Sequence, residues 1–282
     1  MNDLIAYFKE RFPIGVTSLH ALATAAMIVG ISSGTASQLA SLQSALLIGG
    51  SFLFFMFRMR VTDEFKDRRH DDKNYPNRPV QRGLISTHDL LSLGVLALTV
   101  ELVCAWYAGA TTGHPWAIGW HLCILGYSVL THFEFFAKRF LAAHFNFTFI
   151  IHQAIFVLYP LWGFAIWGTQ INARTVIGAV AFVAFMAAME IVRKYEVRLD
   201  PAGVPVPDTY LTVWKSVAFW LMFGVVALAG SALTVISSNY LHVVVAVVFC
   251  TTLLASKSKT ERVRVLVAIA FILQSLVTLL WH

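Results

Sequence analysis

The chain has 282 residues, of which 58% are hydrophobic and 13% are charged, and its mean hydropathy is +0.70. These values lie far outside the average of soluble proteins and exclude an ordinary water-soluble enzyme. The formal net charge of +6 comes from cations gathered in a few loops. It therefore indicates membrane topology and gives no support for nucleic acid as a partner.

Nine apolar stretches, each of bilayer-spanning length and with few or no charges, follow one another along the chain. The longest polar gap is the loop 61–87, so no segment remains for a separate soluble domain. The sequence predicts an all-α integral membrane protein, a single domain over residues 1–282 with nine transmembrane helices. The predicted spans are residues 14–33, 40–60, 88–109, 114–137, 145–168, 174–195, 211–235, 238–255 and 262–281.

The distribution of Lys and Arg predicts the orientation of these spans. With nine spans, the loops 61–87, 138–144, 193–210 and 256–264 fall on the same side as the N-terminus. Of the 21 Lys and Arg residues, 20 lie in or beside these segments, and only Arg174 lies on the other side. By the positive-inside rule this side is cytoplasmic, which places the C-terminus on the opposite side.

The loop after the second stretch holds the most informative pattern in the chain. It reads DEFKDRRHDDKNYPNRPVQRGLIS over residues 63–86, with five carboxylates and six cations in 24 residues. Asp63, Asp67 and Asp71 recur every fourth residue, so on a helix they share one face. Like charges at this spacing repel one another, whereas Mg²⁺ favours a few carboxylates together with phosphate oxygens. The alternative is a solvated loop whose aspartates pair with neighbouring cations.

A second charged segment, MEIVRKYEVRLDPAGVPVPDTY, follows the sixth stretch, four helices later. The first four spans and the next four are thus consistent with a degenerate repeat that brings two charged loops, 61–87 and 193–210, to one central cavity. Carboxylates that bind metal and cations that bind phosphate oxygens suit a diphosphate. The apolar, aromatic-rich bundle beneath suits a long hydrocarbon tail.

The first loop resembles the signature of the UbiA-type intramembrane prenyltransferase superfamily, N-x-x-x-D-x-x-x-D followed by R-P-x-x-x-G. Asp63 stands in the place of the Asn, Asp67 and Asp71 match the two Asp residues, and Arg78 with Pro79 and Gly83 match the tail. The family also places a Lys-Arg pair after the fourth span, and Lys138 and Arg139 stand there. The resemblance extends over the whole chain in topology and implies a bundle around a central, lipid-accessible cavity.

The second loop departs from the family pattern D-x-x-Y-x-x-x-D-x-x-x-D. In one register Glu196 and Asp200 take the last two acidic places. In the other, Glu190 takes the leading place and Arg193 replaces the Tyr, and the trailing acids are lost. We favour the first register because the distance to the seventh span fits better. The gain of Arg193 and Lys194 implies fewer metals, with cations binding the diphosphate directly, or an altered or lost activity.

The resemblance implies Mg²⁺-dependent ionisation of a prenyl diphosphate and transfer of the prenyl group to an aromatic or lipid acceptor in the membrane. The alternatives are a membrane terpene cyclase of the same fold, which uses no acceptor, and a lipid-binding protein or transporter. Compact length and the lack of a targeting segment favour a bacterial or archaeal plasma membrane. The implied metal ligands are Asp63, Asp67, Asp71, Glu196 and Asp200, and the implied diphosphate ligands are Arg78, Lys138, Arg139, Arg193 and Lys194.

Three polar residues near the predicted cytoplasmic end are candidates for lining the cavity or contacting the acceptor: Glu134, Asn146 and Glu190. A carboxylate in a bilayer is unfavourable unless it faces a cavity or finds a partner. Glu134 lies four residues before Lys138, so a helical ion pair between them is the alternative. For Glu196 and Asp200 the alternative is a surface helix end, and for Arg193 and Lys194 it is anchoring at the membrane surface.

Overall fold

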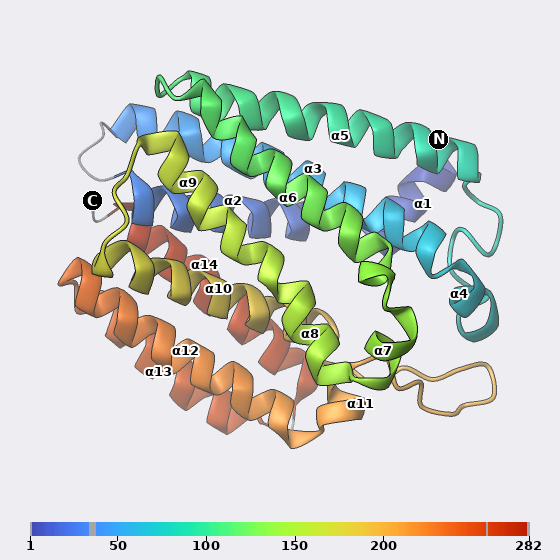
Figure 1. Ribbon diagram of the computed structural model, residues 1–282. Coiled ribbons are helices and arrows are strands. Elements are labelled where there is room, and N and C mark those ends of the chain that lie inside the picture. Colours follow the sequence, from blue (N-terminus) through green and yellow to red (C-terminus); the bar gives the residue numbers. More distant parts are fainter. Residues whose placement is uncertain (1, 34–37, 258, 281–282) are drawn as a thin grey trace.

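The computed structural model describes residues 2–33, 38–257 and 259–280, and within these ranges the regular structure is helical (Figure 1). The α-helices are α1 (Asn2–Arg11), α2 (Ile14–Ser32), α3 (Gln38–Lys66), α4 (Arg68–Asn74), α5 (Thr87–Ala110), α6 (Ile118–His132), α7 (Lys138–Ala143), α8 (Phe145–Gln153), α9 (Leu158–Trp167), α10 (Ala173–Arg193), α11 (Tyr210–Trp214), α12 (Ser216–Ser237), α13 (Leu241–Ser256) and α14 (Thr260–Leu280). Three short 3₁₀ helices are η1 (Pro115–Ala117), η2 (Glu134–Phe136) and η3 (Ala154–Val157).

Seven segments of the described chain are long and apolar enough to cross a membrane. They begin with α2 and α3, include α8 and α9 as one continuous span (Phe145–Trp167), and end with α14. The predicted all-α membrane architecture is confirmed, but the count of nine is not. The two predicted spans that fall short are 114–137, where α6 has 15 residues, and 238–255, where α13 has 16. Both helices are shorter than the roughly 20 residues that a helix needs to cross a bilayer.

The long helices pack side by side, and α2 lies at the centre of the bundle (Figure 1). It contacts α3, α9, α10 and α14, while α5 covers α3 and the pair α12 and α13 covers α10 and α14. The short helices α4, α7 and α11 gather at one end of the bundle, at the right of Figure 1, together with the loop that follows α10. This end also holds the C-terminal ends of α3 and α10, so the two charged loops of the sequence meet there.

Small residues allow the helices to approach closely. A Cβ atom on Gly30 of α2 would lie 2.5 Å from the backbone oxygen of Thr278 in α14, and one on Gly230 of α12 would lie 2.4 Å from the Cβ of Ala246 in α13. Because lipid provides no hydrophobic force between helices, this close packing supplies much of their attraction.

A buried ionic network lies within the spans. Arg58 of α3 donates from Nε to Oε2 of Glu101 in α5 at 2.7 Å and from a terminal nitrogen to Oε1 at 3.0 Å. His121 of α6 lies 3.1 Å from the same carboxylate, and Arg58 also donates to the hydroxyl of Ser128 at 3.0 Å. Glu101 and His121 are fully buried. A carboxylate in a bilayer is unfavourable without a partner, and this network provides one for Glu101 and joins three helices.

We predict that Glu101→Ala destabilises the protein by about 3 kcal/mol or more, because it leaves the Arg58 guanidinium buried without its partner. Thermal unfolding in detergent measures the loss. The matched control is Glu261→Ala, which removes an exposed carboxylate from a surface ion pair with Arg264 and changes stability by less than about 1 kcal/mol. A Glu101→Ala variant as stable as the parent would contradict this account.

Candidate functional site

The acidic stripe lies where α3 ends and α4 begins. The backbone N–H of Asp67 donates to the carbonyl of Asp63 at 2.8 Å, and the N–H of Asp71 donates to the carbonyl of Asp67 at 2.9 Å. The four-residue hydrogen-bond pattern of a helix thus continues across the break between α3 and α4. Asp63, Asp67 and Asp71 therefore follow one another at successive turns, as the spacing predicts.

The three aspartates have different surroundings. Asp71 is buried and pairs with Arg78 and, at 3.6 Å, with Arg11 of α1. Among the described residues, the carboxylates of Asp63 and Asp67 have no hydrogen-bond or ion-pair partner. Burial raises the pKa of Asp67, and the like charge of Asp63 raises it further, while Lys66 and Lys194 act in the opposite direction. Asp71 is thus a neutralised anchor, whereas Asp63 and Asp67 are unpaired anions that repel one another.

The C-terminal end of α10 brings cations to the same place. Arg193 binds both oxygens of Glu190 at 2.8 Å, and the hydroxyl of Tyr210 donates to Glu190 at 3.1 Å. The side chain of Lys194, the next residue, has no hydrogen-bond or ion-pair partner within the described ranges. Burial lowers its pKa, the positive charge of Arg193 lowers it further, and Glu190 and Asp63 partly oppose this. The ends of α3 and α10 thus lie close enough for their charges to interact. The unpaired carboxylates lie where α3 ends, and the unpaired ammonium group follows α10.

Two residues that the sequence analysis did not select connect the charged loops. The hydroxyl of Tyr75, just after α4, donates to Oδ2 of Asp208 at 2.8 Å. Burial and this hydrogen bond raise the pKa of Tyr75, and the Arg78 guanidinium lies over its ring at 3.9 Å from the centroid. Arg198 lies 3.8 Å from the same Asp208 oxygen. No signal along the chain pointed to this contact, because Tyr75 and Asp208 are 133 residues apart.

Glu196 and Asp200 lie in the loop that follows α10. Glu196 pairs with Arg198 at 2.5 Å and with Arg264 of α14 at 3.3 Å. Asp200 accepts from the backbone N–H groups of Ala202 and Val204, which stabilises a tight turn. Both carboxylates thus already have partners in the protein, and their role as metal ligands stays a prediction.

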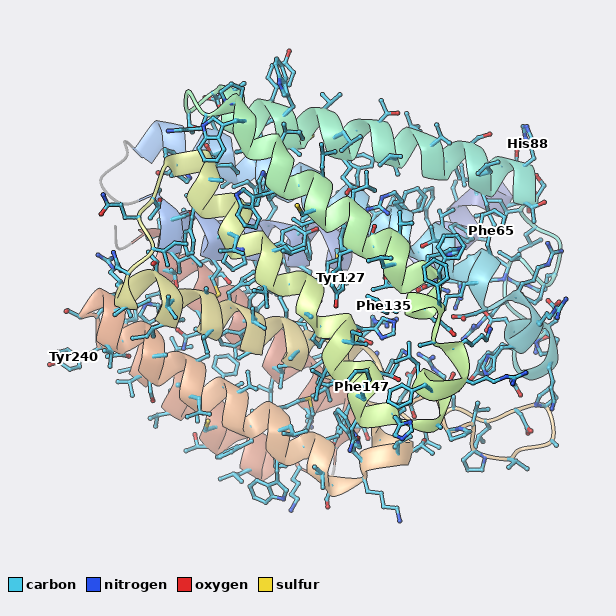
Figure 2. The ribbon with its side chains drawn as sticks, viewed as in Figure 1. Phe65, His88, Tyr127, Phe135, Phe147 and Tyr240 are labelled. Atoms are coloured by element: carbon cyan, nitrogen blue, oxygen red, sulfur yellow. The ribbon has the colours of Figure 1, made fainter. Side chains whose placement is uncertain are left out.

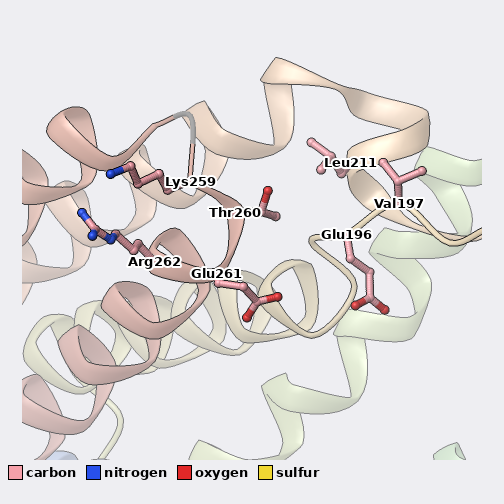
Figure 3. A pocket seen from close by; sticks show the side chains of 7 residues that line it. All are labelled: Glu196, Val197, Leu211, Lys259, Thr260, Glu261 and Arg262. Atoms are coloured by element: carbon pink, nitrogen blue, oxygen red, sulfur yellow. The ribbon is translucent and has the colours of Figure 1, made fainter.

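A surface groove lies apart from the unpaired aspartates. It has a volume of about 570 Å³ and lies between the loop after α10 and the start of α14 (Figure 3). Figure 3 labels its lining residues, Glu196, Val197, Leu211, Lys259, Thr260, Glu261 and Arg262. Glu196 is the one candidate residue that lines it, so the groove adds no metal ligands to the stripe.

The ion pair between Glu134 and Lys138 that helical spacing suggested does not form. The α6 helix ends at His132, and Glu134, Phe135 and Phe136 all have left-handed backbone angles, with φ of 50°, 51° and 57°. The four-residue geometry is therefore absent, and Glu134 instead pairs with Lys66 of α3 at 3.3 Å. The reversal also directs Phe135 toward Tyr127, with ring centroids 5.3 Å apart (Figure 2).

The remaining candidates lie at the same end of the bundle. Lys138 and Arg139 begin α7, where both are exposed, and neither has an ion-pair partner in the described ranges. Asn146 accepts a hydrogen bond from Trp214 at 2.7 Å, which ties α8 to α11. Its side-chain amide is therefore already used in packing.

The chemistry of the donor set suits a magnesium ion shared with a substrate. Within residues 2–33, 38–257 and 259–280, no three His, Cys, Asp or Glu side chains are close enough to form a complete metal site. Mg²⁺ commonly binds one or two carboxylates and completes its shell with water and phosphate oxygens. Asp63 and Asp67 therefore fit a metal that arrives with a phosphate-bearing ligand.

Known proteins resemble this chain in sequence pattern and in fold. Residues 21–277 match the UbiA prenyltransferase family. A solved structure described as digeranylgeranylglyceryl phosphate synthase in membranes has 15% sequence identity and a TM-score of 0.53, with 98% of this chain and 99% of that chain covered. A UbiA homolog from Archaeoglobus fulgidus bound to DMAPP and Mg²⁺ has 12% identity and a TM-score of 0.49, with 97% and 98% covered. A comparison with curated proteins gave no match.

We predict that Tyr75→Phe loosens the contact between the two charged loops without unfolding the bundle. The variant loses one hydrogen bond to a charged group, an effect of about 1.5–3 kcal/mol. Hydrogen exchange should then be faster in residues 195–209, because this loop opens locally without unfolding of the bundle. Tyr240→Phe, at a residue that is 78% exposed, is the control. Unchanged exchange in the 195–209 loop of Tyr75→Phe would show that the contact does not hold it.

Proposed function

The chain belongs to the UbiA prenyltransferase family, and on this premise we propose that it transfers a prenyl group from its diphosphate to an aromatic or lipid acceptor within the membrane. The observation that carries the proposal is the contrast among the acidic residues of the site. Asp71, Glu190, Glu196 and Asp208 are all paired with cations or hydrogen-bond donors. Asp63 and Asp67 are left unpaired opposite Lys194.

Asp63 and Asp67 would hold a Mg²⁺ ion that arrives with the diphosphate. The bound ion would supply charge neutralisation to the departing pyrophosphate. Lys194 binds a remaining phosphate oxygen through its ammonium group, and Arg193 adds positive charge nearby. Lys138 and Arg139 attract the anionic head group to this end of the bundle.

In the reaction, the bond between the allylic carbon and the diphosphate oxygen breaks, and its electron pair leaves with pyrophosphate. The cations around the head group stabilise this developing negative charge more strongly than the charge of the intact substrate. The acceptor then forms the new bond to the allylic carbon and loses a proton. Asp71 acts as a positioning residue, because its ion pairs with Arg11 and Arg78 tie α4 to α1 and to the loop that follows α4.

A second candidate function is a membrane terpene cyclase. Aromatic faces can stabilise a carbocation, and the rings of Phe52, Phe55 and Tyr159 lie together in the bundle. A cyclase would release pyrophosphate without an acceptor, whereas a transferase would require one. A transporter or lipid-binding protein would release none.

We also propose an orientation of the protein in the membrane. The acidic site lies at the end of the bundle where the cation-rich loops gather, so we place it at the cytoplasmic surface of a prokaryotic plasma membrane. Prenyl diphosphates would then reach it from the cytoplasm or along the inner leaflet.

We predict that Asp67→Ala lowers Mg²⁺-dependent pyrophosphate release by at least about 100-fold, because metal ligation supplies several kcal/mol to the transition state. The assay uses purified protein in detergent with Mg²⁺ and C5 to C20 prenyl diphosphates, with and without aromatic or lipid acceptors. Asp200→Ala is the matched control, since that carboxylate stabilises a turn. Equal activity of Asp67→Ala and the parent would overturn the assignment of the metal site.

We predict an alkaline loss of activity that Lys194→Arg removes. Lys194 must be protonated to bind a phosphate oxygen, and its pKa lies below the ordinary 10.5. The value of kcat/KM should therefore fall as the pH rises through this lowered pKa, and the fall should begin below pH 10.5. An arginine stays charged throughout, so Lys194→Arg should show no such fall even where its rate is lower. The same pH profile in both proteins would show that another group titrates.

A further inference from the structure

Aromatic side chains close the bundle a short distance beneath the charged site. Phe52 of α3 has its ring centroid 5.1 Å from that of Tyr159 in α9 and 5.8 Å from that of His20 in α2. His20 in turn lies 5.7 Å from Phe271 of α14, and Phe271 lies 5.4 Å from Phe185 of α10. We call Phe52, Phe55, Tyr159, Phe185 and Phe271 the aromatic floor. Each of these side chains is buried.

Phe52 lies on the same face of α3 as Asp63. Eleven residues, or three helical turns, separate Phe52 from Asp63, so the two project from one face at a separation of about 16 Å. Met56 and Met59 lie between them at helical spacing and are partly exposed, whereas Phe52 is 1% exposed. The partly exposed part of this face thus ends at Phe52.

A buried ionic network holds the floor in place. The Arg58 guanidinium lies 5.5 Å from the centroid of Phe55, and Phe55 lies 5.6 Å from Tyr159. On the other side, Tyr159 lies 6.1 Å from Trp162, whose ring contacts His121 at 4.7 Å. His121 and Arg58 both bind the fully buried Glu101. Rotation of the floor away from a ligand would disturb this network, so the floor is a rigid boundary.

From this geometry we infer that the protein uses a short prenyl donor, of one or two isoprene units, and that Phe52 and Phe55 set this limit. The inference rests on the proposed function. An isoprene unit spans roughly 5 Å, since it contributes four carbon–carbon bonds of about 1.5 Å in a zigzag. Part of the 16 Å is occupied by the metal and the diphosphate, which leaves room for about 10 Å of tail. A C5 or C10 tail fits above the floor, and a C20 tail does not.

The test compares donors of different length on the whole protein. Pyrophosphate release is measured with C5, C10, C15 and C20 prenyl diphosphates, and binding is measured separately with the non-ionising S-thiolodiphosphates of C10 and C20 in the presence of Mg²⁺. The parent should favour C10 over C20 by about tenfold or more in kcat/KM and in affinity, the scale by which a closed apolar pocket discriminates. Phe52→Ala and Phe55→Ala should raise the C20 to C10 ratio by about tenfold.

Three further variants distinguish an effect on tail length from a general effect on stability. Phe219→Ala removes an equally buried ring from α12 and should leave the ratio unchanged. Phe52→Leu is a milder truncation, which should shift the ratio in the same direction if Phe52→Ala fails to fold. Phe52→Trp should weaken C10 while C5 is retained.

Two results would overturn the inference, and they differ. A parent that uses C20 as well as C10, or a ratio that Phe52→Leu and Phe55→Ala leave unchanged, would show that the tail leaves the bundle by another route, while the proposed function stands. Absence of both turnover and binding for every donor would instead remove the proposed function and the inference together.

Discussion

The hydrocarbon of a bilayer does not solvate an unpaired charge, so a charged group there needs a partner or an aqueous cavity. Within the spans, Arg58 and Glu101 form a two-bonded ion pair that His121 and Ser128 complete. The other acidic and basic groups of the two charged loops lie at one end of the bundle. Because α3 and α10 both end there, segments that lie far apart along the chain form one site.

The site is organised by the difference between paired and unpaired groups. Arg78 neutralises Asp71 and ties α4 to the loop that follows it, and Arg193 neutralises Glu190 within the last turn of α10, so these pairs need no ligand. The side chains of Asp63, Asp67 and Lys194 have no such partner. A ligand that carries both signs of charge would relieve the repulsion between the two aspartates and would also pair with the buried ammonium group of Lys194. A diphosphate accompanied by Mg²⁺ has this character. The aromatic floor beneath is apolar, which separates the charged and hydrocarbon parts of such a substrate.

The sequence was sufficient for the class of fold and for the first loop. Long apolar stretches and one-sided cations depend only on composition, so the helical membrane bundle followed from them, and the four-residue spacing of the aspartates persists across the end of α3. Composition did not give the number of spans equally well, because α6 and α13 are shorter than the apolar stretches that contain them.

Tertiary contacts could not be read from spacing. Because the backbone reverses at Glu134, this carboxylate pairs with Lys66 and not with Lys138. Asp200 and Glu196 both fit the family pattern, but Asp200 stabilises a turn and Glu196 pairs with Arg264. The contact between Tyr75 and Asp208 joins two loops whose pairing depends on the packing of the helices between them.

The central claim is that the ends of α3 and α10 hold a metal diphosphate between them. The most direct measurement is a structure of the protein with a prenyl S-thiolodiphosphate and Mn²⁺ in place of Mg²⁺, since anomalous scattering locates Mn²⁺ independently of the protein atoms. The account predicts Mn²⁺ on Asp63 and Asp67, with the diphosphate also bound by Lys194. Mn²⁺ on Glu196 and Asp200, or a diphosphate bound away from Lys194, would contradict it.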